Sequence, residues 1–90
     1  MKHFDWDIEK NLKLKIERGV SFDEVVSILE SEGPLDIIDH PNKDRYPNQR
    51  MYVIEIEEYV YLVPFVEDSE KKFLKTIFPS RKMTKKYLKK

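Results

Sequence analysis

The sequence lacks cysteine altogether, which excludes disulfides, thiol chemistry and zinc sites built on cysteine. It holds only two glycines, too few for a glycine-rich phosphate loop. No apolar run approaches the roughly 20 residues that span a bilayer, and the first residues do not resemble a secretory signal. These absences predict a cytoplasmic protein with no membrane partner.

Acidic residues are missing from the last part of the chain. Residues 71–90 hold nine Lys or Arg and no Asp or Glu, whereas residues 1–70 hold eight bases and all seventeen acids. The two parts therefore carry formal charges of +9 and −9, although the whole chain is neutral. A polyanion responds to the local field rather than to the sum of charges, so this end is predicted to bind one. A solvated, fraying end of the chain would explain the same charges.

The length and the remaining composition predict one domain over residues 1–90. With 40% apolar and 38% charged residues, the chain can build a single modest core. Its two histidines, His3 and His40, are isolated in the sequence, and a solvated loop explains the acids around His40. We therefore expect no metal and no cofactor.

A first helix is predicted over residues 7–18. Ile8, Leu12 and Ile16 recur at four-residue spacing, with charged residues on the other side. Gly19 is well placed to end this helix in the left-handed conformation.

A second helix is predicted over residues 22–32. Ser21 and Glu24 form a capping box, in which each side chain can satisfy a backbone N–H at the start of the helix. Gly33 and Pro34 should end it. Because only two residues separate the two helices, we expect them to be neighbours.

The rest of the chain alternates in the manner of short strands joined by turns. Strands are predicted at residues 35–39, 50–57, 59–66 and 73–78, and residues 3–6 could form a further strand or an extended arm. The third of these strands is apolar on both faces and should be the most buried, although Pro64 argues for a bulge or an edge within it. Glu57 and Glu58 form a tight hairpin turn, and Pro79 should stop the last strand.

A short C-terminal helix is predicted to follow, capped by Ser80 or Thr84 and with Met83, Tyr87 and Leu88 on its apolar side. Long crossover connections are absent, which argues against parallel strands. The predicted fold is α+β, with the helices packed on one face of a sheet of three or four antiparallel strands and a short helix at the C-terminal end.

Basic residues are the best candidates for a functional site. An antiparallel sheet could gather several of them on one concave surface, where they would bind phosphate. These residues are Arg50, Lys75, Arg81, Lys82, Lys85 and Lys86. Tyrosines 52, 61 and 87 could stack unpaired bases, or could equally pack in the core. RNA is therefore the predicted ligand, and Arg and Lys could share the work of cleaving it without a metal.

Three segments resemble the BrnT family of toxins from bacterial type II toxin–antitoxin systems. They are Phe4-x-Trp6-Asp7-x-x-Lys10, Gly19-Val20-Ser21-Phe22-Asp23-Glu24 and Ser80-Arg81-Lys82-x-Thr84-Lys85-Lys86. They occur in the family's order and at about its spacing, across nearly the whole chain. The resemblance implies a RelE-like fold, a metal-independent endoribonuclease activity that halts translation, and neutralisation by a cognate BrnA-like antitoxin. Operator DNA would be contacted only through that antitoxin.

The resemblance also implies roles for single residues. The residues that match by position are Lys10, Arg50, Arg81, Thr84 and Lys85. Together with the basic residues above, this gives a predicted catalytic set of Lys10, Arg50, Arg81 and Lys85 and a predicted RNA-binding set of Arg18, Lys75, Lys82, Thr84 and Lys86. This chain departs from the family at Arg18, where a histidine is usual, at Leu14, where an asparagine is frequent, and at Tyr87, where a glutamate is common.

Two other functions are compatible with the sequence. The same fold could be a non-catalytic domain that binds RNA or a protein, with the acidic hairpin and the basic end as docking surfaces. The basic helix could also bind an anionic membrane, although its apolar stripe of about two turns is short for that purpose.

Overall fold

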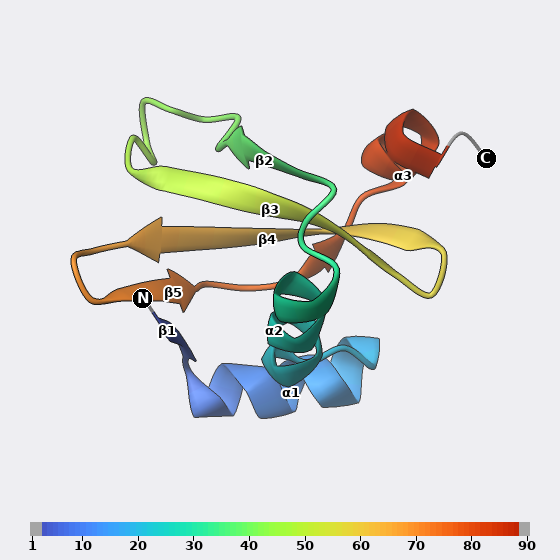
Figure 1. Cartoon of the computed structure of the whole chain (residues 1–90), viewed down its shortest axis with the longest axis horizontal. Coiled ribbons are helices and arrows are strands. Elements are labelled where there is room, and N and C mark those ends of the chain that lie inside the picture. The colour runs from blue at the N-terminus through green and yellow to red at the C-terminus, as the bar shows by residue number, and fades with distance from the viewer. Residues whose placement is uncertain (1–2, 89–90) are drawn as a thin grey trace.

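Three helices and a mixed sheet of six strands make up the computed structural model, which describes residues 3–88 (Figure 1). In chain order the elements are β1 (His3–Trp6), α1 (Ile8–Arg18), α2 (Phe22–Ser31), β2 (Asp36–Asp39), β3 (Gln49–Ile56), β4 (Tyr59–Glu67), β5 (Lys71–Leu74), β6 (Phe78–Pro79) and α3 (Arg81–Leu88). The predicted α+β class is confirmed, but a sheet of three or four strands is wrong. Within residues 3–88, no helix is long and apolar enough to cross a membrane.

The sheet contains one parallel pair, which the sequence had argued against. The strand order is β1-β5-β4-β3-β2, and β6 pairs with β4 beyond the end of β5. β1 runs parallel to β5, with His3 opposite Lys71 and Trp6 opposite Leu74. All the other pairs are antiparallel. The prediction failed because the whole segment from α1 to β4 serves as the crossover between the two parallel strands.

Pro64 divides the last predicted strand into two. The carbonyl of Pro64 accepts a hydrogen bond from the N–H of Lys75 at 2.8 Å, so the backbone of Pro64 faces the β5 and β6 side of β4. Since proline has no N–H, β4 cannot return a hydrogen bond at this place. The segment that runs beside β4 is therefore paired as β5 before Lys75 and as β6 from Phe78 onward, rather than as one strand over residues 73–78.

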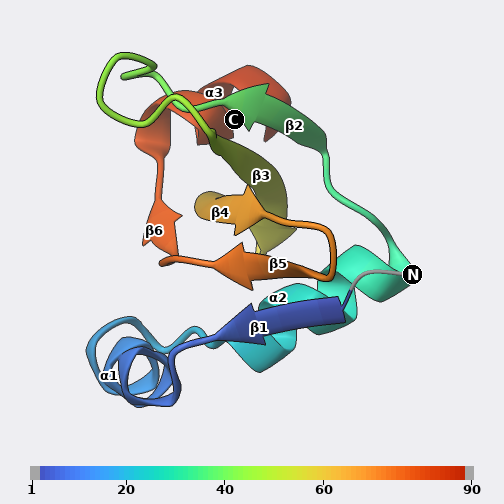
Figure 2. The same ribbon diagram turned by 90° about the vertical axis from the view of Figure 1, so that its left-hand side faces the viewer.

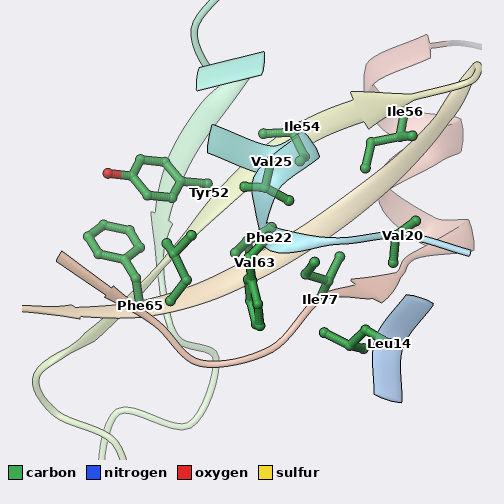
Figure 3. Close-up of a cluster of buried hydrophobic side chains, with 11 residues drawn as sticks. Leu14, Val20, Phe22, Val25, Tyr52, Ile54, Ile56, Val63, Phe65 and Ile77 are labelled. Carbon is green, nitrogen blue, oxygen red and sulfur yellow. The ribbon is translucent and has the colours of Figure 1, made fainter. Parts of the chain in front are cut away.

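The helices cover both faces of the sheet, not one. Tyr52, Ile54 and Phe65 belong to a core cluster that packs against α2 (Figure 3). Alternate residues of the same strands, such as Val53 and Val60, belong to a second cluster that packs against α3. Figure 2 accordingly shows α1 and α2 at the β1 side of the molecule and α3 at the opposite side, near β2. This explains why β3 is buried on both faces, although its alternating sequence predicts one.

Helix α1 is present as predicted but turned the other way. Its apolar stripe faces solvent, with Ile8, Leu12 and Ile16 exposed to 74%, 54% and 85%. Leu14 and Asn11 are the buried residues of this helix, at 3% and 7% exposure. The side chain of Asn11 is satisfied by hydrogen bonds to the start of α2, which makes its burial possible.

The predicted turn and cap residues take the expected conformations. Gly19 ends α1 in the left-handed region at φ 68°, and Gly33 follows α2 at φ 79°. The hydroxyl of Ser21 accepts a hydrogen bond from the N–H of Glu24 at 3.2 Å, as in a capping box. The hairpin between β3 and β4 turns at Glu57 and Glu58, and both have positive φ, at 50° and 64°.

Candidate nucleic-acid interface

Helix α3 is fixed to the edge of β4 by the backbone groups of Val60. The N–H of Ser80 donates to the carbonyl of Val60 at 2.9 Å. The hydroxyl of Thr84 accepts from the N–H of Val60 at 2.9 Å and donates to the carbonyl of Ser80 at 2.7 Å. Ser80 also caps the helix, since its hydroxyl accepts from the N–H of Met83 at 3.2 Å. Thr84 is therefore buried and positions α3, although it had been assigned to RNA binding.

The four cations of α3 project on two flanks of the helix. At about 100° per residue, Arg81 and Lys85 share one flank and Lys82 and Lys86 the other. All four are exposed. Met83, Thr84, Tyr87 and Leu88 lie between the two flanks and cover the second core cluster.

An acidic group lies near the flank of Lys82 and Lys86. The hydroxyl of Tyr87 donates to the Asp36 carboxylate of β2 at 2.7 Å. This hydrogen bond, then one from the N–H of Ile37, and the charge of Lys86 hold the pKa of Asp36 below its ordinary value of 3.8. The same hydrogen bond raises the pKa of Tyr87 above 10.0. Both shifts disfavour proton transfer near neutral pH, so the pair serves to tie α3 to β2.

Another cation, Arg18, lies against the segment that leads into α3. Arg18, at the end of α1, donates from Nη1 to the carbonyl of Ile77 at 2.6 Å, just before β6. Arg81 follows Ile77 by four residues, which limits the distance between their Cα atoms to roughly 14 Å. An arginine has five N–H donors, so Arg18 can hold Ile77 and still bind a phosphate oxygen. The end of α1 is thus fixed to the short segment that leads into Arg81.

An aromatic ring flanked by lysines lies at the start of the same segment. The ammonium groups of Lys71 and Lys75 lie 5.9 and 5.6 Å from the ring centroid of Phe73. Lys71 also pairs with Asp5 at 3.6 Å, while Lys75 is exposed. The ring of Phe73 is half-buried, so it retains a surface on which a base could stack.

We call this line of residues the basic track. It consists of Phe73, Lys75, Arg18, Arg81 and Lys85. Sequence reasoning found its four cations but missed Phe73, which had been counted only as a strand residue. The available signal was the pattern of lysines two residues before and two residues after it.

The remaining predicted catalytic residues do not join the track. Lys10 lies in the first turn of α1, about 12 Å along the helix from Arg18. Arg50 is paired with Phe65 on the face that α1 and α2 cover, opposite the face of α3. There it lines a cavity of about 340 Å³ together with Asp39, Pro47, Asn48, Phe65 and Glu67. The four residues assigned to catalysis are thus divided among three places.

Of the three tyrosines proposed as stacking platforms, Tyr52 and Tyr87 are engaged elsewhere, whereas Tyr61 lies opposite Pro79 of β6, beside the track. Tyr52 is 3% exposed and stacks on Phe65 with centroids 4.1 Å apart, so it packs the core. Tyr61 is half-buried and meets Tyr59 edge-on, and Tyr87 is held by Asp36.

Known proteins give no match for this arrangement. No family model, curated protein or solved structure matches the chain. Within residues 3–88, no group of three or more His, Asp or Glu side chains could hold a metal ion. The candidate binding surface is therefore inferred from the chain's own residues. The track combines cations for phosphate with an aromatic ring for a base, and it contains no carboxylate or imidazole for proton transfer.

Proposed function

We propose that the protein binds single-stranded RNA along the basic track. We further propose, from the resemblance, that it is the BrnT-like toxin of a type II toxin–antitoxin pair with a RelE-like fold, and that it cuts RNA without a metal in the cytoplasm of a bacterium. The observation that carries the proposal is the hydrogen bond of Arg18 to the carbonyl of Ile77, which brings the end of α1 to the segment that leads into the cations of α3. The cations of the track would neutralise phosphates, and Phe73 would stack an unpaired base.

The proposed antitoxin would cover this track. An acidic segment would be attracted to the basic end and would compete with RNA for the same cations. Contact with operator DNA would then occur through the antitoxin alone. Purified antitoxin, encoded by a small neighbouring reading frame, should therefore displace RNA from the protein.

A second candidate function is RNA binding without cleavage. It is favoured by the separation of Lys10 and Arg50 from the track, because phosphoryl chemistry needs its groups within about 3 Å of the reacting atoms. Arg81 and Lys85 could stabilise negative charge in a transition state.

RNA binding is tested by fluorescence anisotropy of a labelled single-stranded RNA over a series of salt concentrations. If Arg81 and Lys85 each contact a phosphate, the double variant Arg81→Ala with Lys85→Ala should bind more weakly and lower the salt slope by about 1.4, since each single-strand contact contributes about 0.7. The matched control is Lys43→Ala with Arg45→Ala, which removes the same charges from the exposed loop after β2. Equal loss in both variants would show that only net charge matters and would contradict the track.

Cleavage is tested by inducing expression in bacterial cells and following growth and total RNA. Growth arrest with RNA decay, absent in the Arg81→Ala, Lys85→Ala variant, is expected for a toxin. Normal growth with folded protein that still binds RNA would favour the second candidate function.

A further inference from the structure

The cavity of about 340 Å³ that contains Arg50 lies where β3 begins and β4 ends, at the left-hand end of the sheet in Figure 1. Its walls come from β2, β3, β4 and the loop before β3, and they are formed by Asp39, Pro47, Asn48, Arg50, Phe65 and Glu67. That loop is braced by its own backbone. The N–H of Tyr46 donates to the carbonyl of Asn42 at 2.9 Å, and the N–H of Gln49 donates to the carbonyl of Tyr46 at 3.2 Å. The cavity is therefore preformed, and its size is within the range of small-ligand pockets.

The arginine in this cavity has no charged partner among residues 3–88. Arg50 lies directly opposite Asp39 in the pairing of β2 with β3, a position at which opposite charges stabilise a sheet. Asp39 pairs instead with Lys43, four residues later, at 3.0 Å. No hydrogen bond or ion pair within the described chain engages the guanidinium of Arg50. Its N–H donors are therefore available to a ligand.

A carboxylate lies diagonally from these donors. Phe65 is opposite Arg50 in the pairing of β3 with β4, and Glu67 follows Phe65 by two residues, so all three project from one face of the sheet. Diagonal neighbours of this kind lie roughly 7–8 Å apart, with the ring of Phe65 beside both. A carboxylate has about four acceptor positions, so Glu67 can receive two N–H groups beside the interaction that it already makes. The cavity thus offers paired donors next to paired acceptors.

We propose that this cavity binds a guanine base, with Arg50 donating to O6 and N7 and Glu67 accepting from N1–H and the 2-amino group. Arginine donating to O6 and N7 of guanine is the commonest base-specific contact of proteins with DNA. Among the four RNA bases, guanine alone has two neighbouring acceptors and, next to them, two neighbouring donors. It is therefore the base that both side chains can bind in a bidentate manner.

The base must be unpaired, because a Watson–Crick pair already uses its N1–H and 2-amino group. Single-stranded RNA and free guanine nucleotides both meet this condition. The proposal does not depend on the basic track. Phe65 is opposite Leu74 in the pairing of β4 with β5, so the adjacent Phe73 of the track projects to the other face of the sheet.

Titration with the 5′-monophosphates of guanosine, inosine, adenosine and cytidine, followed by NMR, tests the base. The guanosine nucleotide should bind most tightly and shift the signals of residues around the cavity. The inosine nucleotide lacks only the 2-amino group and should bind about fivefold or more weakly, as expected for the loss of a bidentate contact. The adenosine nucleotide has an amino group in place of O6 and no N1–H, so it should bind more weakly still. Equal binding of all four would show that Arg50 holds the phosphate, and would overturn the proposal.

Two conservative variants test the residues. Arg50→Lys keeps the charge but loses the planar fork of donors, and Glu67→Gln keeps the shape but replaces one acceptor with a donor. Each should weaken binding of the guanosine nucleotide by about fivefold or more. The matched control is Glu70→Gln, at an exposed position of the turn after β4, which should leave the affinity unchanged. Circular dichroism would show that each variant is folded. Equal affinity in all three variants would overturn the assignment.

Anisotropy with an all-uridine RNA and with the same RNA carrying one guanosine identifies the source of the base. A preference for the second RNA, lost in Arg50→Lys, means that the cavity reads single-stranded RNA. Binding of the guanosine nucleotide without that preference means that a free nucleotide is the ligand. If folded protein binds neither, the proposal fails, whereas RNA binding that depends on Arg81 and Lys85 would be unaffected.

Discussion

The side-chain oxygen of Asn11 accepts a 2.7 Å hydrogen bond from the backbone N–H of Phe22, eleven residues later. The amide nitrogen of the same side chain donates to Asp23 at 3.1 Å. Asn11 and Phe22 are both buried, so this contact joins the middle of α1 to the first turn of α2. Together with the buried Leu14, this polar residue fixes which side of α1 faces the domain.

Replacing Asn11 with alanine should lower the free energy of unfolding by about 1–3 kcal/mol, because it leaves the buried N–H of Phe22 without a partner. Urea unfolding measures the change. The control is Glu17→Ala, at an exposed position of the same helix, which should have little effect. Equal losses in the two variants would contradict a special role for Asn11.

The orientation of α1 shows where sequence reasoning fails. The spacing of Ile8, Leu12 and Ile16 predicts that a helix forms, and the helix is present. The spacing does not predict which side of the helix is buried. The two hydrogen bonds of Asn11 are made to another helix, so they do not affect the spacing of the apolar residues. The division into β5 and β6 was likewise hidden, because it depends on where Pro64 of a neighbouring strand lies.

Thr84→Val should lower the free energy of unfolding by about 1–3 kcal/mol, since valine has nearly the same shape but cannot accept from the N–H of Val60. Thr84→Ser keeps the hydroxyl and should lose less. If Thr84 only positions α3, RNA affinity measured on folded protein should be unchanged in both variants. A loss of affinity in folded Thr84→Val would return this residue to the RNA contacts.

Replacing Glu57 and Glu58 with asparagine and glycine should raise the free energy of unfolding by about 1 kcal/mol, because both positions have positive φ, which costs other residues energy. Thermal or urea unfolding tests this. Alanine at both positions removes the same charges but keeps the strained backbone, and it should bring no such gain. A gain with alanine would point to charge repulsion instead.

The bond between Asp36 and Tyr87 should make stability depend on pH. The pKa of Asp36 is lowered, so its contribution is fully present above the unfolded value of 3.8 and is lost as the pH falls through the lower folded value. Tyr87→Phe should therefore be less stable than the natural chain near neutral pH and equal to it in strong acid.

At alkaline pH the stabilisation from the same hydrogen bond is lost as the pH rises, rather than as it falls. The pKa of Tyr87 is raised, so its contribution is present below 10.0 and is lost as the pH rises through the folded value. Urea unfolding at a series of pH values, on the natural chain and on Tyr87→Phe, measures both limits. A difference that stays constant across the acidic range would contradict this role for Asp36.

The candidate site was predicted in part. The excess of positive charge and the short C-terminal helix identified Arg81 and Lys85, because both features are local in the sequence. Arg18 was named through the resemblance, but its hydrogen bond to Ile77 depends on how α1 meets the sheet edge. Arg50 was expected beside these residues, yet the alternation of β3 places it on the other face.

The parallel pairing of β1 with β5 also bears on how the chain folds. His3 pairs with Lys71, 68 residues later, so this contact closes a loop that contains most of the chain. Contacts so distant in sequence form slowly, because the entropy of closing the loop is lost before the contact is gained. During synthesis, α1 and α2 can pair as soon as both have emerged, while β1 must wait for β5. The first described strand should therefore be among the last to dock, and it should exchange its amide hydrogens sooner than the central strands β3 and β4.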